Sequence, residues 1–184
     1  MMKYLFLVLL ALVMCTGPKD GQSKLALEKG TYMHIKVKDY GEIIVKMYKE
    51  EIPNNVANIV KLTNEGFYNG LTFHRIIKGF MIQGGCPRGD GTGSPGYRID
   101  DEISSKLTHL KGTVAMANSG PNTNGCQFYI CLEPQPRLDG GYTIIGKVIE
   151  GMDIVTRIGN VKTDPMDRPS TPVIMEKIWI VEIN

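Results

Sequence analysis

The sequence predicts a mainly β domain with eight short strands and two helices. Most of the predicted strands alternate apolar with polar residues or form a short apolar run, and glycine- and proline-rich connections separate them. Such a series is typical of closed antiparallel barrels and of sandwiches, and closure removes exposed strand edges. The 184 residues suit a single domain, and the pattern alone leaves barrel and sandwich open.

A hairpin and a helix are expected first. Apolar and polar residues alternate over residues 31–38, and a turn at 39–41 leads into a second strand at 42–48. Pro53 then opens a helix, and Gly66 suits its C-terminal cap. The buried face of this helix is expected to carry Val56, Ile59, Val60 and Thr63.

The rest of the chain supplies six more strands and one more helix. Residues 84–96 hold six glycines and two prolines and are expected as a loop. No helix start with Lys and Ser or Thr follows, so this is not a phosphate-binding loop. We expect strands at 72–77, 80–83, 112–116, 127–132, 143–149 and 173–183, and a short helix at 152–158.

The N-terminus is predicted to be an export signal spanning residues 1–15. Lys3 precedes an apolar run at 4–14 that is too short for the ~20 residues of a membrane-spanning helix. Residues 16–30 are polar and contain Gly, Pro, Ser, Lys and Asp, which is typical of a linker. The folded domain is therefore expected at residues 31–184.

The end of the signal leaves two locations open. Leu-Val-Met-Cys at residues 12–15 resembles a bacterial lipobox, although Met14 stands where that pattern has a small residue. If the motif is used, Cys15 is lipidated and anchors the protein to a membrane as a lipoprotein. If it is not, an ordinary cleavage gives a soluble periplasmic or secreted protein.

Charge and composition exclude several classes of partner. The formal net charge is +2, and removal of residues 1–15 takes away only Lys3 and leaves +1. No basic cluster is present, so no nucleic-acid partner is expected. The histidines show no metal-ligand spacing, so no metal is expected. We expect a monomer.

The cysteines do not form a disulfide framework. Beyond Cys15 the chain has three of them, an odd number, at Cys86, Cys126 and Cys131. The last two lie on one predicted strand, roughly 16 Å apart when extended. This separation is well beyond disulfide reach.

A cation in an apolar stretch is the first feature that points to function. Residues 73–85 read Phe-His-Arg-Ile-Ile-Lys-Gly-Phe-Met-Ile-Gln-Gly-Gly, and period-two alternation places Arg75 on one face with Phe73 and Ile77. A guanidinium stays charged and has five donors in fixed geometry, so it suits an acceptor on a bound ligand. The alternative is a strand arginine paired with a carboxylate.

A second stretch identifies a family. Residues 112–131 read Gly-Thr-Val-Ala-Met-Ala-Asn-Ser-Gly-Pro-Asn-Thr-Asn-Gly-Cys-Gln-Phe-Tyr-Ile-Cys. With the first stretch, they closely resemble the cyclophilin peptidyl-prolyl isomerases, whose motifs FHR, GFMxQGG, MAN, GPNTNG and QF occur here in the family's order over residues 32–183. The resemblance implies a closed eight-stranded antiparallel β-barrel capped by two α-helices, with a peptide groove on its outside.

The reaction that the resemblance implies needs neither nucleophile nor cofactor. An X-Pro bond interconverts over a barrier of about 18–20 kcal/mol because the amide must lose its conjugation as it twists. The prolyl nitrogen then becomes a hydrogen-bond acceptor, and a fixed donor aimed at it stabilises the transition state more than either ground state. Arg75 is the predicted donor.

The other site residues follow from the resemblance. It implies that Phe80, Met81 and Leu138 line a proline pocket, although ordinary core packing would also explain these three side chains. It implies that Gln83, a candidate loop-capping amide otherwise, and the backbone of Ala117 and Asn118 hold the substrate main chain. A further position, Gln127, is expected beside the arginine.

Three positions depart from the best-known family members. Tyr129 stands where a pocket phenylalanine is usual, and its hydroxyl must find a partner. Tyr142 replaces a common histidine and Arg137 a common tryptophan. Arg137 bears on cyclosporin, the cyclic peptide that family members bind in this groove, since a guanidinium is a poor wall for an apolar macrocycle.

Two hypotheses for function remain at this stage. The first is an isomerase that acts on X-Pro bonds of proteins folding outside the cytoplasm, with proline-containing peptides and folding proteins as partners. The second is a peptide-binding or chaperone module in which turnover is incidental. The retained Arg75 favours the first.

Overall fold

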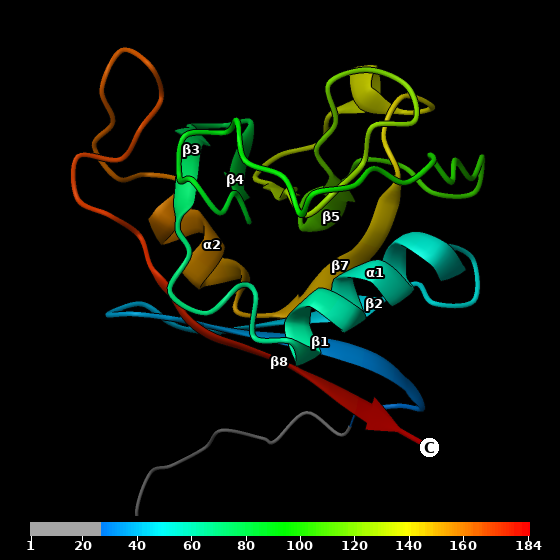
Figure 1. Cartoon of the computed structure of the whole chain (residues 1–184). Coiled ribbons are helices and arrows are strands. Elements are labelled where there is room, and N and C mark those ends of the chain that lie inside the picture. Colours follow the sequence, from blue (N-terminus) through cyan, green and yellow to red (C-terminus); the bar gives the residue numbers. More distant parts are fainter. Residues whose placement is uncertain (1–26) are drawn as a thin grey trace, which may run out of the picture.

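The structure is a computed structural model that describes residues 27–184 (Figure 1). The predicted export signal and the linker up to residue 26 lie outside the described residues and stay predictions. Within residues 27–184, no helix is both long and apolar enough to cross a membrane. The elements are β1 (Gly30–Val37), β2 (Gly41–Met47), α1 (Pro53–Asn64), β3 (Phe73–Ile77), β4 (Met81–Gly84), β5 (Thr113–Met116), β6 (Phe128–Cys131), the 3₁₀ helix η1 (Pro136–Leu138), β7 (Ile144–Glu150), α2 (Met152–Ile158) and β8 (Met175–Ile183).

All eight strands belong to one curled antiparallel sheet (Figure 1), in the order β3-β4-β6-β5-β7-β2-β1-β8. Its edge strands meet through only a few backbone contacts. Phe73 donates its N–H to the Val173 carbonyl at 2.9 Å, and Thr72 forms a bridge with Ile174. The expected eight-stranded antiparallel fold with two helices is confirmed. The expected closed barrel is only partly closed, because these few contacts stand in place of a full ladder of backbone hydrogen bonds between β3 and β8.

The interior of the curled sheet holds the main hydrophobic core. Alternate residues of β1, such as Met33 and Ile35, are fully buried there, and Ile59 of α1 and Ile158 of α2 pack into the same cluster. Burial of each such side chain stabilises the fold by about 1.5–3 kcal/mol. The ring of Phe128 lies at the centre of aromatic contacts and packs edge-on against Tyr68 and Phe73.

Glu102 fixes the long loop between β4 and β5 to the start of α1. No side chain of the helix itself caps this end, which begins at Pro53. The Glu102 carboxylate instead accepts the backbone N–H groups of Asn54 and Asn55, at 3.1 and 2.6 Å. A carboxylate satisfies free N–H groups there and interacts favourably with the helix dipole. At the other end, Gly66 adopts a positive φ, as expected for a C-terminal cap.

One expectation about β3 is wrong. Phe73 is fully buried in the interior core, whereas Arg75 is exposed on the outside. The pairing of β3 with β4 shifts register between these two residues, and such an irregularity breaks the period-two alternation. Arg75 therefore shares the outer face with Ile77 but not with Phe73.

Candidate active site

Alternation along neighbouring strands creates a second apolar cluster on the outside of the sheet. Ile82 of β4 and Ile130 of β6 point into the interior core. Their neighbours Met81 and Tyr129 point the other way and pack with Ala115 of β5. A one-residue step reverses the face because side chains alternate along a strand.

A pocket of about 180 Å³ opens over this outer cluster. It is lined by side chains from β3, β4 and β6, from the segment after β5, from η1 and from the segment before β7. A small cavity with an apolar wall and polar groups at its rim is typical of a ligand site. The lining residues are Arg75, Phe80, Met81, Gln83, Ala117, Asn118, Tyr129, Leu138 and Tyr142. We call this cavity the proline pocket, after the role that the family resemblance implies for it.

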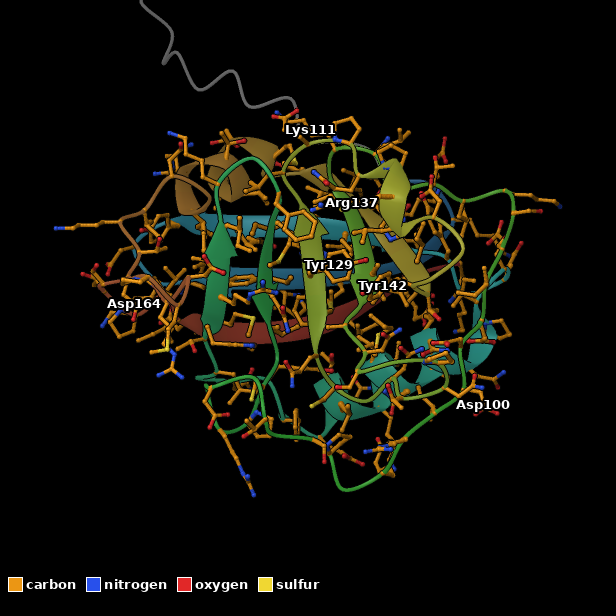
Figure 2. The ribbon with its side chains drawn as sticks, turned by 90° about the horizontal axis from the view of Figure 1, so that it is seen from above. Asp100, Lys111, Tyr129, Arg137, Tyr142 and Asp164 are labelled. Atoms are coloured by element: carbon orange, nitrogen blue, oxygen red, sulfur yellow. The ribbon has the colours of Figure 1, made fainter. Side chains whose placement is uncertain are left out.

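Arg75 lies at the rim of the proline pocket and is held by a loop from the other end of the chain. Its Nε is 3.4 Å from the Asp167 carboxylate, and the Asp167 carbonyl accepts the Ile76 N–H at 2.8 Å. Asp164 fixes the loop tip by accepting the N–H groups of Met166 and Arg168. Figure 2 shows the loop with Asp164 beside β3. Asp167 thus orients the guanidinium, and it is the one hydrogen-bond partner that the described residues give the Arg75 side chain.

Two glutamines form the polar side of the site. Gln83 pairs with Arg75 across β3 and β4, and its Nε2 donates to Gln127 Oε1 at 3.1 Å. Gln127 Nε2 in turn donates to the carbonyls of Gly91 and Gly93 at 2.9 Å each. Gln127 therefore fixes the glycine-rich loop and orients Gln83. It does not line the proline pocket, but it lines an adjoining depression that also includes Gln83.

Ala117 and Asn118 present backbone beside the pocket. The Ala117 N–H donates to the Gln127 carbonyl at 2.9 Å, which continues the β5–β6 pairing. Asn118 Oδ1 accepts the Gly120 N–H, and its Nδ2 donates to the Gly141 carbonyl. In the described part of the chain, the Asn118 backbone N–H and C=O have no partner. They are available to an extended peptide.

The Tyr129 hydroxyl finds its partner behind the pocket. Tyr129 Oη is 2.9 Å from His109 Nε2, and His109 Nδ1 is 2.7 Å from Asp139 Oδ1. Hydrogen bonds from His109 hold the pKa of Asp139 below its usual range. An ionised Asp139 accepts the Nδ1 proton, which leaves Nε2 to accept the tyrosine proton. Burial raises the pKa of Tyr129, so the hydroxyl keeps its proton.

The other two departures also lie at the pocket. The Tyr142 ring packs edge-on against Tyr129, with 5.9 Å between the ring centroids. The guanidinium carbon of Arg137 lies 4.7 Å from the centroid of the Phe80 ring. Figure 2 shows Arg137, Tyr129 and Tyr142 close together on this face. The Phe80 ring, which lines the pocket, is therefore covered by the Arg137 cation.

The described residues hold no group of three or more His, Cys, Asp or Glu side chains that could bind a metal ion. Cys86, Cys126 and Cys131 are buried and free. Burial raises the pKa of Cys126 and of Cys131 to about 12, so these thiols stay protonated and unreactive near neutral pH.

The sequence did not reveal three residues that shape the site. Asp167 lies 92 positions after Arg75, and His109 and Asp139 come from two loops. Each contacts its partner only after the chain has folded, so no local spacing could indicate it. The unmatched hydroxyl of Tyr129 was the one signal, because a buried hydroxyl requires a partner.

The chain is similar to known peptidyl-prolyl cis-trans isomerases along most of its length. The family model described as cyclophilin type peptidyl-prolyl cis-trans isomerase/CLD matches residues 32–180. A peptidyl-prolyl cis-trans isomerase of Synechococcus elongatus is 52% identical over 122 residues, which cover 65% of this chain and 83% of that protein. Peptidyl-prolyl cis-trans isomerase B of Bacillus subtilis is 49% identical over 125 residues, with 67% and 87% covered.

Solved structures lead to the same family. A cyclophilin-type isomerase of Cryptosporidium parvum, solved in the presence of the dipeptide Ala-Pro, superposes with a TM-score of 0.79 at 34% identity. The match covers 83% of this chain and 99% of that one. The chain belongs to the cyclophilin-type peptidyl-prolyl cis-trans isomerases, a family of enzymes that rotate the bond preceding proline.

Proposed function

We propose that this protein accelerates cis-trans isomerisation of X-Pro bonds in proteins that fold outside the cytoplasm. The proline ring enters the pocket formed by Phe80, Met81 and Leu138, and the flanking backbone pairs with Gln83 and Asn118. Arg75 then donates to the prolyl nitrogen as the amide twists.

The observation that carries this proposal is the position of Arg75. It lies at the rim of a pocket whose apolar wall includes Phe80, Met81 and Leu138. A permanently charged donor beside a cavity fitted to a small ring is suited to stabilise the twisted amide. The Ala-Pro dipeptide used with the Cryptosporidium relative supports a proline-containing ligand for this chain as well.

The experiment is a direct assay of isomerisation with the mature chain. The uncatalysed reaction takes tens of seconds or more, so a protease-coupled assay at low temperature resolves it from the catalysed one. Exchange between cis and trans peptide signals in NMR serves as a second readout that needs no coupling enzyme. A rate equal to the uncatalysed rate in both assays would contradict the proposal.

The location is a separate part of the proposal and rests on residues 1–15. The motivation is the charged start and short apolar run, followed by a cysteine in a lipobox-like context. We propose export, with Cys15 as a lipid anchor. Mass spectrometry of the mature N-terminus is expected to find an acylated Cys15. An unmodified N-terminus further along would favour a soluble exported protein, and retention of Met1 would contradict export.

A further inference from the structure

Arg137 is the one cation over the proline pocket, within the described residues, that no carboxylate balances. It lies in η1 next to Leu138, which lines the pocket, and its guanidinium stacks on the Phe80 ring. No acidic oxygen of residues 27–184 comes within 4.0 Å of it. The other arginine of the pocket, Arg75, has Asp167 as its partner.

The carboxylates near η1 are already engaged. Asp139 accepts both the ring Nδ1 and the backbone N–H of His109, at 2.7 and 2.8 Å. Glu133 pairs with Lys111 at 3.1 Å. Arg137 therefore has no carboxylate partner within 4.0 Å among residues 27–184, and it is available to an incoming anionic group.

Hydrogen bonds hold the backbone around Arg137 in place, so its side chain can distinguish between substrates. The Leu138 and Asp139 N–H groups donate to the carbonyls of Gln135 and Pro136 within the 3₁₀ turn. Gln135 also donates from its Nε2 to the Gly79 carbonyl, in the turn before Phe80. The segment bearing the cation is thus connected to the segment bearing the aromatic wall.

We propose that Arg137 is a specificity-determining residue that favours prolines flanked by an acidic side chain. A peptide whose proline ring contacts Phe80 places an adjacent residue beside the guanidinium on that ring. A Glu or Asp carboxylate there forms an ion pair with the exposed Arg137. This inference rests on the proposed function and names the class of X-Pro sequence that this pocket prefers.

The kinetic form of the effect follows from the chemistry. The flanking side chain does not change as the X-Pro bond rotates, so the ion pair stabilises substrate and transition state equally. Uniform binding of this kind lowers KM and leaves kcat unchanged. Exposed ion pairs measured in other proteins correspond to a gain of up to about fivefold in affinity, and salt screens them.

The experiment compares peptides that differ by one charge. Two series carry Glu, Gln or Lys either immediately before or immediately after the proline, with all other residues neutral. We expect kcat/KM to be about two- to fivefold higher for Glu than for Gln in one series, through KM. Arg137→Gln should abolish this ratio, Arg137→Glu should invert it in favour of Lys, and Arg137→Lys should retain part of it.

Controls separate charge from pocket damage. The Gln peptides report any damage to the pocket, so the Glu-to-Gln and Lys-to-Gln ratios within each Arg137 variant isolate the effect of charge. Lys177→Gln removes a comparable cation that lies over Trp179 on β8, away from the pocket, and should keep the wild-type preference. The Glu-to-Gln ratio should also fall at about 1 M salt, where the Debye length is about 3 Å.

Two results would overturn the inference. One is a wild-type protein that does not distinguish Glu from Gln in either series. The other is a preference that persists in Arg137→Gln. If no peptide is isomerised at all, the proposed function fails instead, and NMR titration of the same peptides still measures the charge preference in binding.

Discussion

Tyr129→Phe tests the hydrogen bond behind the proline pocket. The substitution removes the hydroxyl whose oxygen lies 2.9 Å from His109 Nε2. The His109 side chain is fully buried, so water cannot replace the lost partner. A buried polar atom left without a partner costs about 1–3 kcal/mol, and a change of 1 kcal/mol shifts Tm by roughly 2–4 °C in a domain of this size.

Urea unfolding and turnover should respond differently to this change. We expect the midpoint to fall with an unchanged m-value, because the same surface is exposed on unfolding. The ring still packs against Tyr142, so kcat/KM for a small peptide should stay within about twofold. Tyr142→Phe is the matched control, since the described residues offer its hydroxyl no hydrogen bond, and it should leave stability unchanged. A Tyr129→Phe protein as stable as wild type would refute the reasoning.

Three further predictions concern the surroundings of the site. Asp167→Asn should lower kcat about two- to fivefold with little change in KM, because the guanidinium of Arg75 loses its partner; Glu176→Gln, which removes the remote exposed pair with Lys36, should not. The pKa of Asp139 is lowered in the folded state, so its carboxylate stabilises the fold above the unfolded pKa of about 3.9, and this contribution is lost as pH falls through the folded pKa. The free energy of unfolding of Asp139→Asn, measured with urea, should therefore depend less on pH below about pH 4. Cyclosporin should bind wild type roughly 30- to 150-fold more weakly than Arg137→Trp, because wild type lacks one neutral hydrogen bond and an aromatic contact that the tryptophan supplies. Equal inhibition of the two proteins in a cyclosporin titration would contradict this.

The regular part of the fold was predictable because local pattern determines it. Alternation in β1 correctly placed Met33 and Ile35 inside, and Gly66 correctly ended α1. The irregularity between Phe73 and Arg75 could not be predicted, since it depends on how β3 pairs with β4. Barrel and sandwich were separated only by the family resemblance, because both share the same alternation.

The candidate site was predictable as a set of residues but not as a network. Nine of the ten expected residues gather around the proline pocket, and the tenth, Gln127, supports Gln83 from behind. The contacts of Asp167 and of the Asp139–His109 pair join loops that are distant in sequence. Their geometry depends on the packing of the whole domain, which no single stretch encodes. The catalytic and binding roles assigned to these residues stay predictions.

The most direct test of the account is the effect of Arg75→Ala on kcat. Arg75 is about half exposed and, among residues 27–184, is paired only with Asp167, so its removal should leave the fold intact, as urea unfolding can verify. Loss of a donor that acts on the transition state is expected to lower kcat about 10²- to 10³-fold, while peptide affinity measured by NMR changes little. A kcat within about twofold of wild type, in a folded variant that binds peptide, would contradict the role of Arg75 as the donor to the prolyl nitrogen.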